Sequence, residues 1–298
     1  MSRLAAGLRS LPLALVGSAS ARLHDLTAAD AAVRAPLTLN RRIGVVQAAG
    51  GSGASTVAAN LASIVAHRRS GLVLAVNASA GTHNVLWHAG VPTSDAGRPV
   101  GRTLPTAPRS AEQATAQLPV SPTGLLGLDL RHPAHPTTPA PSRTWFDHIN
   151  PVSRFFDLVV TDWGVRGWQV DLSQVALASH VMCIVTRSER HAVEEAAAIV
   201  PALQGQGDGL RIVFVIVNVS GTRGSAPTMN LTRTLGVPVI RIPHDPAAGA
   251  ATPVASVHTT AQTRISHAVL AGTIMAEAQR SLLAPGTPST HQTLEAIR

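Results

Sequence analysis

A short glycine-rich turn between an apolar segment and an alanine-rich segment constrains the fold more than any other feature of the sequence. The apolar segment Ile43–Val46 predicts a buried strand, and the segment Ser55–Arg68 predicts a helix, with the turn at residues 49–53 between them. A second buried strand is predicted at Leu72–Val76. Two strands joined in this way by a helix form a βαβ unit, which requires a parallel sheet and a right-handed crossover.

The same alternation of apolar strands and helical segments continues along the chain. Further strands are predicted at Leu125–Leu130, Leu158–Thr161, Val181–Val185, Ile212–Val217 and Val237–Ile240. Helices are predicted at Glu189–Leu203 and Val257–Leu283. We therefore expect an α/β fold, namely a doubly wound, mostly parallel sheet of about seven strands with helices on both faces.

The turn and breaker residues suggest how the chain is organised around this sheet. Residues 1–37 are expected to form an N-terminal helical extension, with a helix at Thr27–Val33 that ends before Pro36. Residues 38–284 are expected to form the main domain, and 285–298 a mobile tail. Within the domain, residues 90–123 contain six prolines and little apolar periodicity, so they are expected to be a surface insertion.

The composition is that of a folded chain with an unusual set of basic residues. Hydrophobic residues make up 45% of the 298 residues and charged residues 13%. The net charge is +8, yet all basic residues apart from histidine are arginine, and they are scattered along the sequence. A biased genome is the favoured explanation, and an arginine surface for DNA or an anionic membrane is the alternative.

Two features of the sequence bear on the cellular compartment. The only cysteine, Cys183, lies in an apolar run, which indicates a core residue and excludes an internal disulfide framework. The apolar centre of the N-terminal segment is broken by Pro12 and is shorter than a signal peptide requires, and no run is long enough to span a bilayer. We therefore expect a cytoplasmic protein.

The glycine turn resembles the phosphate-binding loop of a known family. The segment Ala48-Ala49-Gly50-Gly51-Ser52-Gly53-Ala54-Ser55-Thr56 is similar to the deviant Walker A loop of the MinD/ParA family of P-loop ATPases. In that family a signature lysine precedes the paired glycines and a second lysine follows the third glycine. Both lysine positions, 49 and 54, are alanine in this chain. The glycines themselves, with the backbone N–H groups and the helix N-terminus, retain the character of an anion-binding loop.

Other segments resemble the same family in the same order, over roughly residues 35–280. Asn77-Ala78-Ser79 aligns with the switch I Asp-x-Asp segment, so both acids of that segment are replaced. Residues 156–162 resemble the Walker B strand, which puts Asp162 at the position of the carboxylate on the magnesium side. Three later segments, 179–186, 215–218 and 236–245, resemble later strands of the family, and Asn218 falls where the family recognises adenine.

The resemblance implies a nucleotide site that is incomplete. Nucleotide contacts are expected from Gly50, Gly51, Gly53, Ser55, Thr56 and Asn218, and magnesium contacts from Ser55 and Asp162. Without a lysine, binding of ATP and Mg²⁺ is expected to be weak, and no catalytic residue is assigned. A structural role is the alternative for two of these residues, with Ser55 as a helix N-cap and Asp162 as a turn residue at a strand end.

A closer resemblance is to the MinD-like proteins that actinobacteria encode beside type VII secretion genes, which share the N-terminal helix and the segment at 34–37. This favours a pseudo-ATPase scaffold that binds protein partners in a secretion or partition assembly, at the inner face of the membrane. One alternative is a weak ATPase completed by a residue of a partner. Another is an arginine-driven binder of DNA or of a membrane surface. Homodimer formation is left open.

Histidines and tryptophans invite two further hypotheses. The pairs His132/His135 and His83/His88 lack a cysteine or carboxylate at ligand spacing, so they are interpreted as exposed loop histidines rather than metal ligands. Trp163 and Trp168 follow the aspartate of the Walker B-like strand and are expected either to cover the nucleotide site or to pack against a neighbouring helix.

Overall fold

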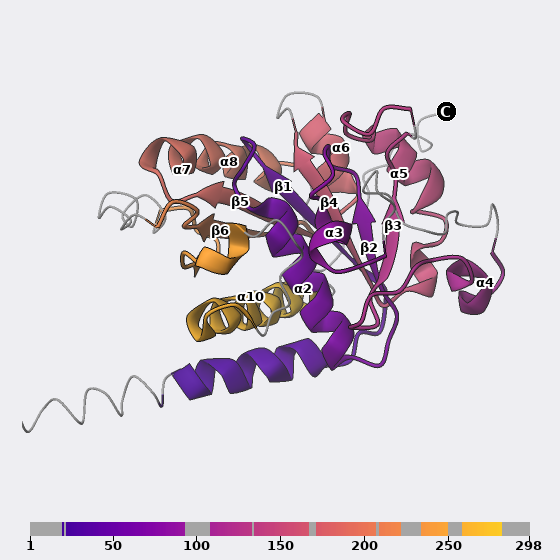
Figure 1. The fold of residues 1–298 in the computed structure, drawn as a ribbon, viewed down its shortest axis with the longest axis horizontal. Helices are drawn as coiled ribbons and strands as arrows, with labels where there is room; N and C mark the ends of the chain where they lie inside the picture. The colour runs from indigo at the N-terminus through magenta and orange to yellow at the C-terminus, as the bar shows by residue number, and fades with distance from the viewer. Residues whose placement is uncertain are drawn as a thin grey trace, which may run out of the picture.

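A seven-stranded sheet, parallel throughout, forms the centre of the molecule (Figure 1). The computed structural model describes residues 20, 22–92, 108–132, 134–166, 171–206, 209–221, 234–249 and 258–281. The strand order is β3-β2-β4-β1-β5-β6-β7. The strands are β1 (Arg41–Gln47), β2 (Val73–Asn77), β3 (Leu126–Asp129), β4 (Leu158–Val165), β5 (Val181–Arg187), β6 (Arg211–Val217) and β7 (Val239–Ile242).

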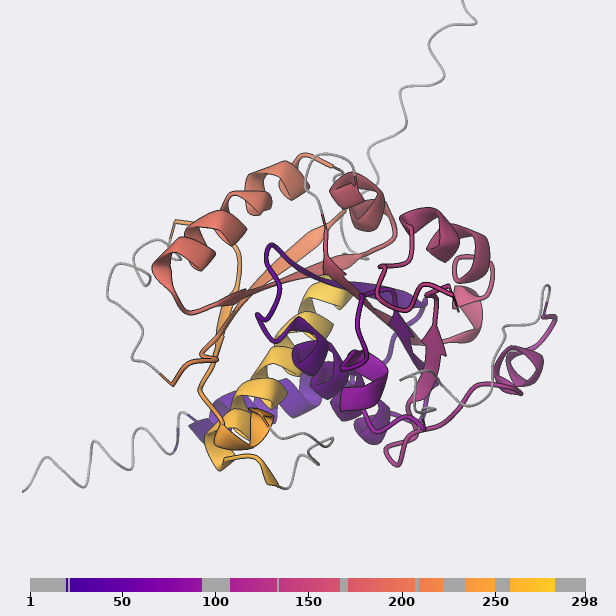
Figure 2. The same ribbon diagram turned by 45° about the horizontal axis from the view of Figure 1, so that its top comes forward.

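Helices cover both faces of this sheet (Figures 1 and 2). One face carries a helix at residues 22–34 together with α2 (Ala54–Arg68), α3 (Val85–His88) and α10 (Ala261–Arg280). The other face carries α5 (Ser142–His148), α6 (Asp171–Leu177), α7 (Arg190–Ala197) and α8 (Ile199–Gln204). A short helix, α4 (Ala111–Thr115), and two 3₁₀ turns, Ser153–Phe155 and Pro246–Gly249, complete the described elements. The predicted doubly wound α/β fold is confirmed.

Alternate residues of each central strand enter two separate hydrophobic clusters. In β5, Val181 and Cys183 pack with α2 and α10, whereas Met182 and Ile184 pack with the helices of the opposite face. Because both faces are buried, the central strands are continuous apolar runs rather than alternating ones. Cys183 is fully buried, as expected for a core residue, and burial raises the pKa of its thiol to about 12.

Three element boundaries differ from the sequence expectation for local reasons. The closing helix begins at Ala261 rather than Val257, because the Thr260 side chain caps it by accepting a hydrogen bond from the Thr263 amide. The helix expected at Glu189–Leu203 divides at Ala198, three residues before Pro201, which has no N–H to continue the hydrogen-bond ladder. The last strand lies two residues further along the chain than expected.

The described part of the proline-rich segment at 90–123 forms no strand of the sheet, but some of it contributes to the core. Residues 93–107 lie outside the described residues, as do the tail at 285–298 and Trp168. In the remainder, Ala114 of α4 and Leu118 are buried, and Leu118 packs with the cluster of the α5 face. This end of the predicted surface insertion is therefore anchored to the domain.

The predicted helix at Thr27–Val33 is confirmed within residues 22–34, and it lies against α10 (Figure 2). The approach is close at Gly272, where an added Cβ would lie 2.5 Å from the Ala29 Cα. At the other end of the helix, Nη1 of Arg69 donates hydrogen bonds to the carbonyls of Val33 (2.7 Å) and Ala35 (2.6 Å). The close approach at Gly272 and the two hydrogen bonds from Arg69 therefore join the N-terminal helix to the domain.

Replacing Gly272 by alanine should weaken this attachment. The new methyl group meets backbone rather than a movable side chain, and such overpacking costs about 1–3 kcal/mol, against about 1 kcal/mol gained from helix propensity. We expect a net loss in the free energy of unfolding, measured in urea, and faster proteolysis of the N-terminal helix. Gly209→Ala is the control, because nothing lies within 4 Å of an added Cβ there. Equal stability of the two variants would contradict the close approach.

Candidate functional site

The glycine turn joins β1, the central strand of the sheet, to α2 at the carboxyl edge. Gly51 and Gly53 have φ values of 75° and 84°, in the left-handed region that favours glycine, whereas Gly50 does not require glycine for its φ. Gly53 is the N-cap residue of α2 and provides no side-chain cap. Ser55 therefore lies in the first turn of the helix, and the expected alternative that Ser55 is the N-cap is wrong.

Backbone N–H groups are the main polar groups that the turn offers. The amides of residues 50–55 donate no hydrogen bond to another residue in the described part of the chain. With the N-terminus of a 15-residue helix behind them, they form a weakly positive concave surface. The side chains add no charge, since positions 49 and 54 are alanine and Ala54 is buried in the core. An anion would be held here by dipoles alone.

Asp162 of β4 lies behind the turn and is completely buried. Its Oδ2 accepts hydrogen bonds from the hydroxyls of Ser55 (2.6 Å) and Ser79 (3.1 Å), and its Oδ1 accepts one from the Gly164 amide (3.0 Å). Burial raises the pKa of the Asp162 carboxyl above its usual range, although these hydrogen bonds oppose the shift. Asp162 therefore presents no surface to solvent.

The hydrogen bonds continue from Asp162 to a buried ion pair. The Ser79 hydroxyl also lies 2.8 Å from Oδ1 of Asn77, so its one proton is shared between Asn77 and Asp162, and Nδ2 of Asn77 donates to Asp129 (3.0 Å). Asp129 pairs with Arg131, whose Nη2 lies 2.6 Å from its Oδ2, and both side chains are almost fully buried. We call these six residues, Ser55, Ser79, Asp162, Asn77, Asp129 and Arg131, the carboxylate network.

The Asp129–Arg131 pair was not among the residues expected from the sequence. Arg131 also donates from Nη1 to the carbonyls of Gly81 (2.6 Å) and Pro136 (2.7 Å), so it fixes the loops that follow β2 and β3. The available signal was an acid and an arginine two residues apart directly after a buried strand. That signal is weak, because most ion pairs are exposed and exposed pairs contribute little to stability.

A magnesium ion fits only part of the residue set that the resemblance implied. The hydroxyl of Ser55 donates its proton to Asp162 and keeps lone pairs that could bind a cation. Asp162 has no exposed atom, so it does not fit as a direct ligand and would instead orient Ser55. Mg²⁺ prefers six oxygen ligands and usually keeps several waters. Ser55 would be its one protein ligand here, with water and phosphate as the rest.

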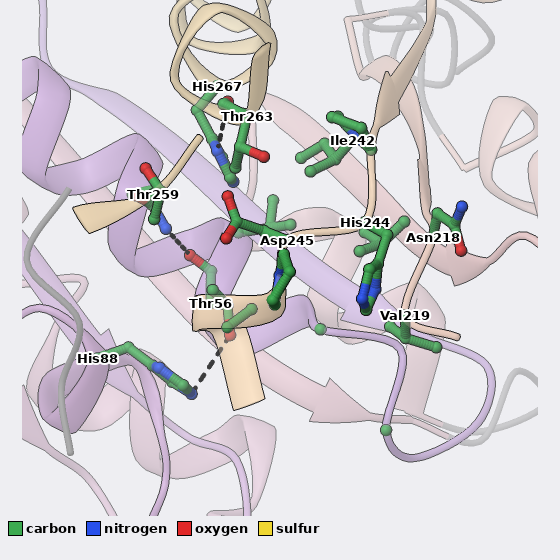
Figure 3. Close-up of a pocket in the computed structure, with 18 of the residues that line it drawn as sticks. Thr56, His88, Asn218, Val219, Ile242, His244, Asp245, Thr259, Thr263 and His267 are labelled. Carbon is green, nitrogen blue, oxygen red and sulfur yellow. Dashed lines mark hydrogen bonds between the residues drawn. The ribbon is translucent and has the colours of Figure 1, made fainter. Parts of the chain in front are cut away.

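A pocket of about 490 Å³ opens beside the glycine turn, between α2, α10 and the carboxyl ends of β6 and β7 (Figure 3). Gly51, Gly53, Thr56 and Asn218 line it, and thus four of the expected nucleotide residues share one cavity. Asn218 accepts a hydrogen bond from the Gly221 amide (3.0 Å). Gly50, Ser55 and Asp162 are not part of its lining. The structure therefore separates the pocket from the magnesium residues.

Residues from α10 and from the loop after β7 form much of the pocket, and the sequence did not single most of them out. Asp245, Thr259, Thr263 and His267 lie along this side, and His88 faces them from α3 (Figure 3). Burial would raise the pKa of Asp245, but hydrogen bonds from Thr260 and Thr263 outweigh it, so the pKa is lowered. Asp245 is therefore a carboxylate at neutral pH.

Two pocket histidines are neutral at physiological pH. Burial lowers the pKa of His267 and of His88 to about 4. Nδ1 of His267 bonds to the carbonyl of Thr263 (3.0 Å), while its buried Nε2 has no partner in the described part of the chain. Nε2 of His88 lies 3.3 Å from Oγ1 of Thr56. His88 is thus a pocket residue, and its interpretation as an exposed loop histidine is wrong.

His132 and His135 lie on the surface, and Trp163 lies in the core. His132 and His135 are exposed with ring centroids 5.5 Å apart, and no group of three metal-binding side chains occurs among the described residues. Trp163 is fully buried in the core against Trp145 and does not line the pocket.

No helix among the residues described is both long and apolar enough to cross a membrane.

Comparison with solved structures identifies the fold. MinD from Pyrococcus horikoshii OT3, in complex with Mg-ADP, superposes with a TM-score of 0.59 at 20% identity, covering 78% of this chain and 95% of MinD. MinD of Pyrococcus furiosus gives 0.55 at 21% identity, covering 78% and 99%. The MinC:MinD complex of Aquifex aeolicus gives 0.52 at 18% identity, covering 83% and 97%.

These similarities establish that the chain has the MinD/ParA-like P-loop fold. No family model matches the sequence, and no curated protein is significantly similar to it. The likeness is thus one of architecture at low sequence identity. The chemistry of this chain has to be argued from its own residues.

Adding a second carboxylate to the carboxylate network should destabilise the protein. In Ser79→Asp the new acid lies beside buried Asp162, and an uncompensated buried charge costs about 3–5 kcal/mol. Ser79→Ala, which only removes hydrogen bonds, should cost about 1–2 kcal/mol. Urea unfolding of both variants measures the difference. If the two were equally stable, the site would be open enough to solvate an acid.

Stability should fall below pH 6.5 through His267. Its pKa in the folded protein, about 4, is below the unfolded value of 6.5, so only the unfolded chain gains this proton as the pH falls through that window. The stability contributed by neutral His267 is complete above pH 6.5 and is lost towards pH 4, at up to about 1.4 kcal/mol per pH unit. His267→Phe should flatten this slope in urea unfolding. An NMR titration of His267 showing a pKa near 6.5 would contradict the assignment.

Proposed function

We propose that this chain is a MinD/ParA-like scaffold that has no ATPase cycle and acts by binding other proteins. The observation that carries this proposal is that the glycine turn itself contains no lysine or arginine. Arg187 lines a separate small hollow with Ala48, Ala49 and Ser52, and its Nε lies 3.9 Å from Oε2 of Glu189. Alanine occupies positions 49 and 54, and no arginine is among the described residues that line the pocket beside the turn. Phosphoryl transfer depends on positioning and on charge stabilisation, and neither lysine that the resembling family uses is present.

The expected loss of affinity is large. A charged contact to a buried anion contributes on the order of 2–5 kcal/mol, which corresponds to roughly thirty- to several-thousand-fold in the dissociation constant. The free amides of the turn and the dipole of α2 together recover only part of this, since a helix dipole contributes about 0.3–1 kcal/mol at an exposed site. Backbone groups alone therefore leave ATP weakly held.

The carboxylate network, which includes Asp162 behind the glycine turn, also supports the proposal that this chain has no ATPase cycle. Asn77 and Ser79 stand where the resembling family has the two acids of switch I, and both are engaged in hydrogen bonds that end at the Asp129–Arg131 pair. These residues are held by one another. A loop held in this way has no charged group with which to respond to a γ-phosphate.

The proposed setting is a protein assembly. The Aquifex aeolicus relative is a MinC:MinD complex, which is consistent with a fold used for protein contacts. The resemblance of residues 34–37 to MinD-like proteins encoded beside type VII secretion genes favours a secretion or partition assembly, at the cytoplasmic face of the membrane. The alternatives are a weak ATPase completed by a partner residue and an arginine-driven binder of DNA or of an anionic membrane.

Calorimetric titration of the full chain with ATP and ADP, each with Mg²⁺, tests the proposal. We expect little heat at ligand concentrations at which a complete P-loop site would saturate, and no release of phosphate above the buffer rate. Asp162→Ala is the control for hydrolysis. Phosphate release by the wild-type chain that disappears in Asp162→Ala would show that the lysine-free site works.

A further inference from the structure

The amino edge of the sheet, where the strands begin, carries an arginine and a histidine that lie side by side. Arg42 is the second residue of β1, and His180 directly precedes β5, the neighbouring strand. The amide of His180 donates a hydrogen bond to the carbonyl of Arg42 (2.8 Å), and both residues are half-buried. This pair can therefore be reached from solvent at the edge of the sheet opposite to the glycine turn.

The position of the proton on His180 follows from a backbone contact. Nδ1 of His180 accepts a hydrogen bond from the amide of Arg42 (3.0 Å). Burial, together with the charges of Arg42 and Arg41, lowers the pKa of His180 to about 4, so the ring is neutral at physiological pH. A neutral imidazole carries one proton, and with Nδ1 as the acceptor that proton lies on Nε2. His180 therefore presents Nε2 as an N–H donor.

Two N–H donors face each other in this pair. Nη2 of Arg42 lies 3.4 Å from Nε2 of His180, and neither nitrogen has a lone pair to offer the other. Within the described part of the chain, Nε of Arg42 is buried without a partner, and Arg42 forms no ion pair with a carboxylate. An oxygen atom placed against Nη2 and Nε2 would accept hydrogen bonds from both.

Other contacts hold the guanidinium of Arg42 in place. Its Nη1 donates to Oδ1 of Asn150 (3.1 Å), and its Cζ lies 5.7 Å from the centroid of the Trp145 ring. Trp145 belongs to α5 and is fully buried, so its ring gives the arginine a fixed surface. The donors are therefore preorganised, which lowers the entropy cost of binding a ligand.

A carboxylate matches this pair of donors better than a phosphate does. Carboxylate oxygens and the planar guanidinium form short, charge-assisted hydrogen bonds. The pair offers one full charge, on Arg42, beside a neutral ring N–H on His180. A carboxylate carries a single negative charge, whereas a phosphate dianion brings a second charge that the neutral ring leaves uncompensated. An acidic side chain on an extended segment can also reach a half-buried pair at the edge of a sheet.

We propose that Arg42 and His180 form a binding site for a carboxylate, supplied by an aspartate or glutamate in an acidic segment of a partner protein. The inference rests on the proposed function, because it names the chemistry by which a scaffold of this fold would recognise its partner. It goes beyond that function by placing the contact at the amino edge of the sheet, opposite to the glycine turn.

Calorimetric titration of the full chain at low salt with four probes tests this site. The probes are acetyl-tetraglutamate amide, acetyl-tetraglutamine amide, acetate and inorganic phosphate. We expect the glutamate peptide to bind at least about tenfold more tightly than each of the other three, because only this peptide presents a carboxylate on a peptide segment.

NMR of His180 in the wild-type chain gives a second readout that a purely structural role would not move. In the free chain the ring proton should be on Nε2. The glutamate peptide should shift the ¹⁵N resonance of Nε2 and raise the pKa of His180 from about 4 by roughly one unit or more, since a bound carboxylate stabilises the imidazolium. A proton on Nδ1 in the free chain would overturn the inference, because the two donors would then not converge.

Arg42→Gln removes the charge of the site, so it should reduce the preference for the glutamate peptide over the glutamine peptide to less than about twofold. Arg154→Gln is the matched control, because it removes the same charge from an exposed arginine in the 3₁₀ turn Ser153–Phe155. This control should keep the preference. If Arg42→Gln does not fold, the order of affinities and the ¹⁵N shift in the wild-type chain still decide the question.

The outcomes separate this inference from the proposed function. Equal binding of the two peptides would overturn the inference and leave the pseudo-ATPase proposal standing. Equal loss of the preference in Arg42→Gln and Arg154→Gln would also overturn it, by showing that diffuse positive charge attracts the peptide. Acetate or phosphate that bound more tightly than the glutamate peptide would overturn the assignment to a protein carboxylate, and phosphate would favour the DNA or membrane alternative. ATP turnover that is lost in Asp162→Ala would overturn the proposed function, whatever the peptides do.

Discussion

The burial of a parallel sheet on both of its faces is the constraint on which the rest of this structure depends. Strands such as β5 have no polar side to turn towards water, so every crossover must place a helix over one face or the other. The switch in strand order beside β1 then opens a crevice at the carboxyl edge. The glycine turn, Asp162 and the pocket all lie along that edge because the fold leaves no other place for a site of this kind.

Within that edge, several polar side chains form hydrogen bonds to one another. The carboxylate network runs from α2 through β4 and β2 to β3, and each member has a hydrogen-bond partner within it. A buried network that is fully satisfied rigidifies its surroundings, whereas a nucleotide switch requires groups whose partners change. At the same edge, positions 49 and 54 are alanine and positions 77 and 79 are an asparagine and a serine, so none of the four side chains carries a charge.

The sequence predicts the fold better than it predicts the site. Apolar runs such as Ile43–Val46 and Leu158–Thr161 are unambiguous, because only buried parallel strands need so little polarity. The pocket is different, since it is built by α10 and the loop after β7, which are distant in sequence from the glycine turn. Nothing in the local pattern around His267 distinguishes a pocket wall from the apolar side of any amphipathic helix. The role of Asp162 as a buried partner of Ser55, rather than an exposed metal ligand, likewise depends on packing that sequence spacing does not reveal.

The helix α2 connects two parts of the molecule that have been described separately. Its first residue follows the glycine turn, and Arg69, directly after its last residue, holds the carbonyls of Val33 and Ala35. Fifteen helical residues at about 1.5 Å each make a stiff rod of roughly 22 Å between these ends. The N-terminal helix is thus held from two elements at once, by Arg69 at the end of α2 and by the close approach of Gly272 in α10 to Ala29. Because the two contacts come from different helices, a shift of α2 relative to α10 would strain one of them.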